Sequence, residues 1–127
     1  MKITSFNPQI IAKNAEPIVK FFEELGFERT HMKDDFTETN ALGYQLKNPD
    51  GFKIDVSQTD NAMLPVDSMA SIRMNVDNYD EVYKFLVSRG FKSVYGDRPS
   101  NAATSKNNVM ISPSGFSINL VEHLKDH

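Results

Sequence analysis

Along the first half of the chain, alternating hydrophobic and polar positions predict four strands, interrupted once by a helical repeat. The helical repeat lies between Asn14, a residue type that often caps helix N-termini, and Gly26, a typical stop at the C-terminal end. Its apolar positions are Ile18, Val19, Phe21, Phe22 and Leu25. The expected strands cover residues 6–13, 27–33, 39–46 and 52–57, with a turn at Asp34-Asp35. This order is a βαβββ module.

The second half repeats the same order of patterns. Apolar and polar residues alternate over residues 71–76, and Asn78 with Glu81 has the spacing of a helix capping box. The apolar stripe of the second helix is Tyr79, Val82, Phe85 and Leu86, and Gly90 ends it. Further strands are expected at residues 91–95, 108–111 and 116–121. The polar stretch 96–108 is predicted to be a loop, either a lid or disordered, and residues 122–127 a frayed tail.

A short phrase, Pro-x-Gly-Phe, occurs in both halves and fixes their correspondence. Gly51 and Gly115 of this phrase are separated by the same length of chain as Gly26 and Gly90 at the helix ends, and we call this separation the repeat offset. In such a turn, proline presets φ and glycine accepts the left-handed position that follows. One offset at two separate landmarks indicates a tandem repeat. We therefore predict an α+β fold of two βαβββ modules, at about residues 1–57 and 69–127, joined by a linker at 58–68.

Composition and charge remove several classes of function. The 127 residues suffice for one domain, and the absence of cysteine excludes disulfides and thiolate metal sites and fits a reducing compartment. A net charge of −3 without a basic run argues against a nucleic-acid partner. No apolar stretch approaches the roughly 20 residues that span a bilayer, and the N-terminus lacks an apolar signal core. A cytoplasmic protein without a membrane partner is expected.

In the first and fourth strand of each module, one face is polar throughout. Its members are Asn7, Gln9, Lys13, Lys53, Asp55, Ser57, Arg73, Asn75, Ser117 and Asn119. Such a face is solvated in many half-buried antiparallel sheets. If the sheet curls, however, the same side chains line a concave surface, which is the usual shape of a ligand site. The sequence leaves both interpretations open.

Two segments carry a family resemblance. Phe21-Phe22-Glu23-Glu24-Leu25-Gly26-Phe27 and Asn48-Pro49-Asp50-Gly51-Phe52 are similar to motifs of the vicinal oxygen chelate superfamily, which includes glyoxalase I, extradiol dioxygenases and bleomycin-resistance proteins. The resemblance covers nearly the whole chain. It implies curved mixed sheets that form a cup, helices on the outer face, pairing as a homodimer and, in the enzymes, a divalent metal in the cup.

The resemblance also implies where metal ligands would stand. Counting back from the helix caps, the first-strand positions fall on Asn7 and Ser71, and the strands after the turns supply Asp55 and Asn119; a shift of two places Gln9 first. Only Asp55 is an ionised ligand type, whereas nickel, zinc and iron favour imidazole and carboxylate. The histidines do not complete the set: His31 falls in the second expected strand, and His123 and His127 fall in the tail, where His123 shares the parity of Asn119. We expect no metal, no cofactor and no catalytic residue.

The leading hypothesis is a metal-free protein that sequesters or senses a small, anionic ligand in the cup. Its expected ligand-binding residues are Asn7, Gln9, Asp55, Arg73, Asn75 and Asn119. Arg73 would orient an anionic or carbonyl group through its planar set of donors; the alternative for Arg73 is a salt bridge to a carboxylate such as Asp55.

Two other classes of function stay open. The first is a divergent metal-dependent lyase or dioxygenase of the same superfamily, or a metal-independent isomerase with Asp55 as the base. A base needs a raised pKa, and nearby cations would lower that of Asp55. The second is a regulatory or structural module that acts through protein contacts, for which the apolar residues 63–66 are the candidate surface.

Overall fold

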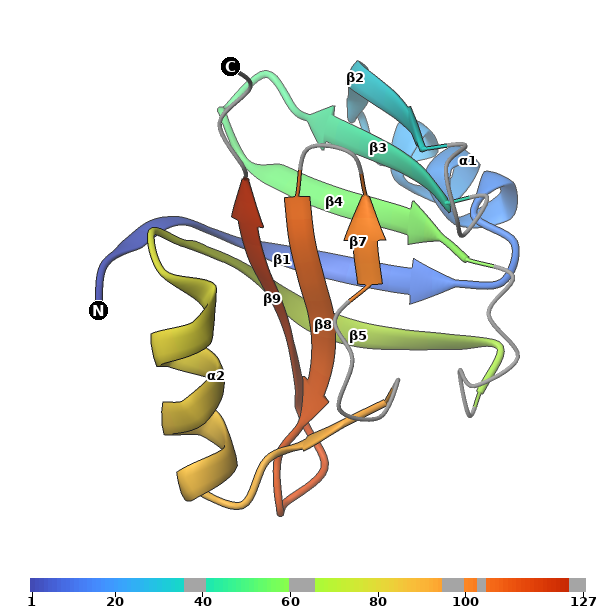
Figure 1. Cartoon of the computed structure of the whole chain (residues 1–127). Coiled ribbons are helices and arrows are strands. Elements are labelled where there is room, and N and C mark those ends of the chain that lie inside the picture. The colour runs from blue at the N-terminus through green and yellow to red at the C-terminus, as the bar shows by residue number, and fades with distance from the viewer. Residues whose placement is uncertain (36–40, 60–65, 95–99, 103–104, 124–127) are drawn as a thin grey trace. The chain divides into compact units, whose positions relative to one another are not determined.

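The computed structural model describes residues 1–35, 41–59, 66–94, 100–102 and 105–123 (Figure 1). The chain divides into two units, which we name the first unit (Asn7–Ala70) and the second unit (Met1–Phe6 with Ser71–His127). Each unit is mixed α and β, and each contains one helix. The predicted α+β class is confirmed, and so is the predicted order in which a strand, a helix and further strands follow one another in each module.

The first unit carries one helix on a sheet of four strands in the order β2-β3-β4-β1. Its elements are β1 (Ile3–Ala12), α1 (Glu16–Glu24), β2 (Glu28–Asp35), β3 (Ala41–Lys47) and β4 (Lys53–Gln58). Strands β1 and β4 are parallel, and the other neighbours are antiparallel. Helix α1 contacts β2 and β3 and buries Val19 among apolar strand residues such as Leu46 and Val56. The polar parity of these strands therefore lies on the face away from α1.

The second unit repeats this arrangement in the order β5-β9-β8-β6, and a short additional strand, β7, pairs with β8. Its elements are β5 (Ser68–Val76), α2 (Tyr79–Ser88), β6 (Lys92–Ser93), β7 (Ser100–Ala102), β8 (Ser105–Ile111) and β9 (Ser117–His123). Strands β5 and β9 are parallel, and the rest are antiparallel. Helix α2 lies against β9 and packs Val82 and Leu86 on Met110 and Leu120 (Figure 1).

The repeat extends to the register of the strands. In the first unit Gln9 is the Cα partner of Asp55, and in the second unit Arg73 is the partner of Asn119. Arg73 follows Gln9 by the repeat offset, and Asn119 follows Asp55 by the same offset. The offset that the sequence shows at its glycines therefore holds for individual strand positions as well.

The ends of the two helices differ from each other. Asn78 caps α2 as predicted, because its Oδ1 accepts a hydrogen bond from the backbone N–H of Glu81 at 3.1 Å. The prediction that Asn14 caps α1 is wrong: the N-cap is Ala15, whose backbone N–H donates to Oε1 of Gln58 at 3.0 Å. A side chain from the end of β4 thus satisfies a helix terminus that its own sequence does not cap.

Several strand boundaries differ from the prediction. The expected turn at Asp34-Asp35 belongs to β2. The described residues of the expected loop at 96–108 include β7 and the start of β8. Pairing with β9 holds this polar segment in the sheet, which alternation in the sequence does not reveal. The expected tail begins inside β9, where Oε1 of Glu122 accepts from the backbone N–H of Tyr79 at 2.6 Å.

The apolar stripe of α1 is narrower than predicted. Phe21 and Leu25 are 55% and 61% exposed, whereas Val19 is fully buried. Most of the linker and of the candidate apolar surface at 63–66 lies outside the described residues, as does His127. Among the described helices, neither is long and apolar enough to cross a membrane.

Candidate functional site

The polar face of the first unit centres on Gln9 and Asp55. These residues are opposite one another on the parallel strands β1 and β4, and Gln45 of β3 is the partner of Asp55 on its other side. Gln9 is only 1% exposed and Asp55 only 5%. Three neighbouring strands thus bring two amides and one carboxylate into a row.

Hydrogen bonds hold the side chains of this row. Nδ2 of Asn7 donates to Oδ2 of Asp55 at 3.2 Å, and Nε2 of Gln9 donates to Oγ of Ser57 at 2.7 Å. The predicted ligand residues Asn7, Gln9 and Asp55 are therefore brought together. In the pairing of β1 with β4, Gln9 lies opposite Asp55 and Asn7 does not. This agrees with the alternative in which the first-strand position is shifted by two residues, from Asn7 to Gln9.

The polar face of the second unit centres on Arg73 and Asn119, which are partners on β5 and β9. Nε of Arg73 donates to Oδ1 of Asn75 at 3.2 Å, so the neighbouring amide orients the guanidinium group. Arg73 is half-buried, and Asn75 is buried. The three predicted ligand residues of this half, Arg73, Asn75 and Asn119, are likewise brought together.

Ser71 is a residue of this face that the list of expected ligand residues lacks. It lies two residues before Arg73 on β5, hence on the same side of the strand, and it is paired with Ser117. Its buried Oγ has no hydrogen-bond partner among the described residues. A buried hydroxyl without a partner costs roughly 1–3 kcal/mol, so it marks a place where a further group would be stabilised. The alternation over residues 71–76 contains the signal for Ser71, because serine there shares the polar parity.

Burial argues against the first of the two interpretations of the polar face, a solvated surface. Five of its members or immediate neighbours on the same parity are buried: Gln9, Asp55, Ser71, Asn75 and Ser117. A solvated face would leave these side chains exposed, since a polar group gains most from water. Only the outer positions, such as Lys13 and Lys53, are exposed. The centre of each polar face is therefore not a solvated surface.

The residues at these positions do not fit a divalent metal, which favours imidazole and carboxylate ligands. The central pair of the first unit offers one carboxylate and one amide, and that of the second unit offers an amide beside the guanidinium of Arg73, whose charge would repel the ion. In the described part of the chain, no three His, Asp or Glu side chains gather in a group that could hold a metal. His31 is placed on β2 opposite Gln45, and His123 is an exposed residue at the end of β9.

No protein-family model and no curated protein matches this sequence. Several solved structures share its fold. Methylmalonyl-CoA epimerase from Mycobacterium tuberculosis has a TM-score of 0.63 at 16% identity, covering 97% of this chain and 90% of that chain. A variant of the epimerase from Streptomyces coelicolor, solved in complex with 2-nitronate-propionyl-CoA, has a TM-score of 0.62 at 16% identity, covering 98% and 100%.

A third structure, a glyoxalase/bleomycin resistance protein/dioxygenase superfamily member from Vibrio splendidus, has a TM-score of 0.54 at 16% identity, covering 95% of this chain and 99% of that chain. At these identities the likeness concerns the fold. The chain has the vicinal oxygen chelate fold, as the sequence motifs predicted.

Proposed function

We propose that this chain, with its vicinal oxygen chelate fold, binds a small organic molecule that carries a carboxylate or carbonyl group, and binds it without a metal ion. The observation that carries the proposal is the buried Oγ of Ser71, which has no hydrogen-bond partner in the described part of the chain, beside the oriented guanidinium of Arg73. Together they offer a hydroxyl and a cationic donor on one side of β5. A ligand oxygen would satisfy both.

Arg73 has the chemistry to fix such a ligand. Asn75 holds the guanidinium through Nε, which directs its remaining N–H groups as a planar pair. A planar pair of N–H donors matches the two oxygens of a carboxylate, and charge-assisted bonds of this kind are about twice as strong as neutral ones. Asn119 is the adjacent position on β9 and supplies a neutral amide.

The polar face of the first unit provides a second set of hydrogen-bonding groups. Asn7 and Gln9 use amide N–H groups within the protein, toward Asp55 and Ser57. Amide carbonyl oxygens and carboxylate oxygens are both acceptors, and they suit the hydroxyl or amide protons of an organic ligand. We assign Asn7, Gln9 and Asp55 to ligand binding on this basis, with no catalytic role.

One of the similar structures and the donor set of this chain both support a small-molecule ligand. One of the similar structures is a complex with an acyl-CoA analogue, so the same fold accommodates an organic anion there. The donor set of this chain lacks the imidazoles that a metal would need, which favours binding over metal-dependent chemistry. The proposal includes assembly as a homodimer and a cytoplasmic location, the latter fitting a chain without cysteine.

A thermal-shift screen in the presence of EDTA tests the proposal. The library contains mono- and dicarboxylates, 2-oxo acids and aromatic acids, with the corresponding amides as neutral controls. We expect at least one acid, but not its amide, to raise the melting temperature. Arg73→Met should abolish the shift, and Arg73→Lys should weaken binding by tenfold or more, because lysine keeps the charge but loses the planar donors.

The control variant is Arg89→Met, which removes an exposed arginine from the same unit. It should leave the shift unchanged. A ligand that binds Arg73→Met as tightly as the unmodified protein would overturn the assignment of Arg73. The screen is repeated without EDTA, and acids that raise the melting temperature only in that second screen would overturn metal-free binding.

A further inference from the structure

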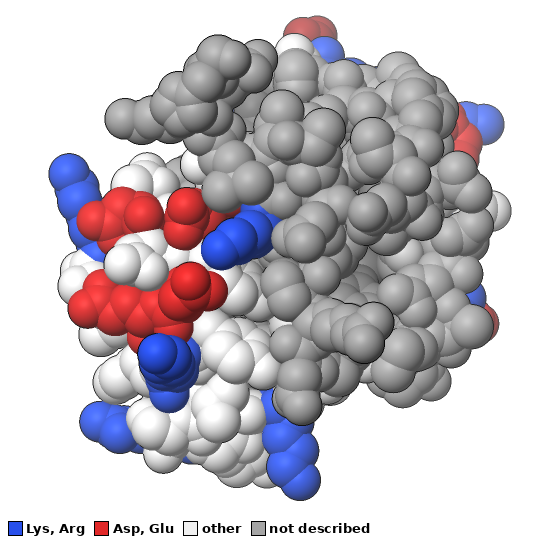
Figure 2. All heavy atoms as spheres, in the orientation of Figure 1, with Lys and Arg blue, Asp and Glu red and all other residues white. Residues whose placement is uncertain are grey.

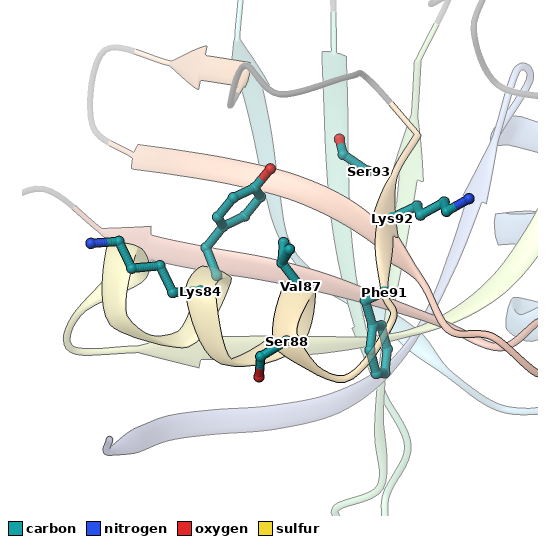
Figure 3. Close-up of a pocket in the computed structure, with 7 residues that line it drawn as sticks. Lys84, Val87, Ser88, Phe91, Lys92 and Ser93 are labelled. Atoms are coloured by element: carbon teal, nitrogen blue, oxygen red, sulfur yellow. The ribbon is translucent and has the colours of Figure 1, made fainter.

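A groove on the second unit lies apart from the residues discussed so far. It runs between the C-terminal half of α2 and the segment that follows it, and its cavity volume is about 690 Å³ (Figure 3). Four residues of α2 and three residues from Phe91 to Ser93 line it. Volumes of roughly 300–1,000 Å³ are typical of sites for small organic molecules.

The groove has an apolar wall that neighbouring rings hold in place. Tyr83 stacks on Tyr79 with ring centroids 5.7 Å apart, and the rings of Phe91 and Phe116 form a T-shaped pair, also with centroids 5.7 Å apart. Val87 also lines the groove and is 46% exposed. Aromatic contacts of this kind fix ring orientation, so the apolar surface is formed before a ligand arrives.

Two lysines flank this wall. Lys84 extends from α2 and Lys92 from β6, on opposite sides of Val87 (Figure 3). Residues 82–96 contain Lys84, Arg89 and Lys92 but no acidic residue, although the whole chain has a net charge of −3. The residues that line the groove therefore include two lysines and no acidic residue, and in Figure 3 the two ammonium groups lie at opposite ends of it.

The nearest acidic residues along α2 are engaged elsewhere. Asp80 pairs with Lys106 at 3.8 Å, and Glu81 pairs with the N-terminal ammonium of Met1 at 3.4 Å. Figure 2 shows acidic and basic side chains gathered together on the side of the molecule where α2 lies. Lys84 is left without an ion pair among the described residues, and so is Lys92.

The serine hydroxyls of the groove already donate their protons within the protein. Oγ of Ser88 donates to the backbone carbonyl of Phe85 at 2.6 Å, and Oγ of Ser93 donates to Oδ1 of Asn108 at 2.5 Å. The charged donors that a ligand meets are the lysine ammonium groups. Such donors select an anion over a neutral molecule.

The repeat supplies an internal comparison. When the two modules are aligned on Gly26 and Gly90, the first unit has Glu23, Glu24 and Glu28 where the second has Val87, Ser88 and Lys92. Arg29, the counterpart of Ser93, is tied to Glu16 at 2.8 Å and to Glu23 at 3.1 Å. The first unit therefore has an acidic surface at the same place in the fold. Lys20 stands at the position of Lys84, so that lysine belongs to both modules, whereas Val87 and Lys92 distinguish the second unit from the first.

We infer that the groove between α2 and β6 is a second binding site, which takes a small amphipathic anion: a carboxylate or sulfonate on an aromatic or aliphatic body. The apolar wall contacts the body, and Lys84 or Lys92 pairs with the anionic group. This site does not involve Arg73, so its test can fail or succeed independently of the test of the function proposed above. A concave groove of this volume suits a single small molecule better than a flat lipid surface.

The test uses 1-anilinonaphthalene-8-sulfonate, an aromatic sulfonate whose fluorescence rises in apolar surroundings, with the intact protein. We expect saturable binding of one probe per chain, displaced by decanoate but not by decyltrimethylammonium. Lys84→Glu/Lys92→Glu should weaken probe binding by at least tenfold. The control, Lys20→Glu/Lys47→Glu, changes the net charge equally but acts on the first unit, and it should leave the affinity within twofold.

A second pair of variants tests the apolar wall. Val87→Asn should weaken the probe about fivefold, whereas Val66→Asn, at a valine that is also 46% exposed, should not. Equal loss in both charge-reversal variants would overturn the site, since it would reflect net charge alone. Displacement of the probe by decyltrimethylammonium would also overturn the site. The same holds if the protein does not bind the probe but binds phosphatidylglycerol vesicles in a way that depends on both lysines. Melting temperatures of all variants identify any loss that comes from unfolding.

Discussion

A Cβ atom added to Gly90 would lie 2.8 Å from Cγ of Pro113. The end of α2 is thus packed directly on the proline of the turn between β8 and β9. At Gly26, the equivalent residue of the first unit, an added Cβ would meet nothing within 4 Å. Both glycines have a positive φ, 90° and 104°, so the two positions share a backbone conformation but differ in packing.

This difference predicts unequal effects of one substitution. Gly26→Ala should lower the free energy of unfolding by about 1–2 kcal/mol, the cost of a left-handed conformation for a residue with Cβ. Gly90→Ala should cost about 1–3 kcal/mol more, because the methyl group overlaps the Pro113 ring. Urea unfolding followed by circular dichroism measures both. Equal losses for the two variants would show that Pro113 moves aside freely.

The two helix starts provide a second pair of variants. Asn78→Ala removes an acceptor for the backbone N–H of Glu81 and should destabilise the protein by about 1 kcal/mol. Asn14→Ala should change stability by a few tenths of a kcal/mol at most, since Ala15 occupies the cap position of α1. The same unfolding experiment decides. A loss at Asn14 as large as that at Asn78 would contradict the cap assignment.

Tyr79 predicts how stability changes at alkaline pH. Burial raises the pKa of its phenol above the usual value of 10.0, and a contact with Asn108 opposes this only in part. The unfolded chain therefore releases this proton at a lower pH than the folded protein does. Stability is unaffected below about pH 10 and falls as the pH rises from there through the higher folded pKa.

Tyr79→Phe removes this titration. Between pH 9 and 11, its free energy of unfolding should fall less steeply than that of the unmodified protein. Tyr44→Phe, which changes another buried tyrosine, is the control for loss of a hydroxyl. Parallel pH profiles for the unmodified protein and Tyr79→Phe would contradict the raised pKa.

Metal addition tests the fit of the donor set. After treatment with EDTA and its removal, nickel, zinc, manganese and iron(II) are added singly at increasing concentration. We expect no rise in melting temperature, whereas a metal at a hundredfold its dissociation constant would add about 2.7 kcal/mol of stability. A rise that Asp55→Ala abolishes would overturn this expectation and favour a metal-dependent activity.

The sequence predicted the fold well because the fold depends on features that local patterns carry. Alternating strands, two helical stripes and glycines that recur at one offset suffice to identify two βαβββ modules. The cap of α1 was missed because it comes from Gln58, which is 43 residues away in sequence. Strand β7 and the start of β8 were missed because their polar residues acquire strand structure through pairing with neighbours.

The candidate site was predicted in part. Strand parity placed Asn7, Gln9 and Asp55 on one face and Arg73, Asn75 and Asn119 on another, and each set is found together. Parity could not show that the centres of these faces are buried, because burial depends on what covers a strand. Nor could parity distinguish Ser71, whose hydroxyl stands out because it is buried and has no hydrogen-bond partner among the residues that the structure describes.

The first six residues of the chain belong to the unit that the last part of the chain builds. The backbone N–H of Asp77 donates to the carbonyl of Lys2 at 3.1 Å, and the N–H of Lys2 donates to Oδ1 of Asp77 at 3.2 Å. The boundaries of the sequence repeat therefore differ from the boundaries of the two compact units. A fragment that begins at Ser71 would lack a piece of its own structure, and a synthetic peptide of residues 1–6 is the natural complement to supply in trans.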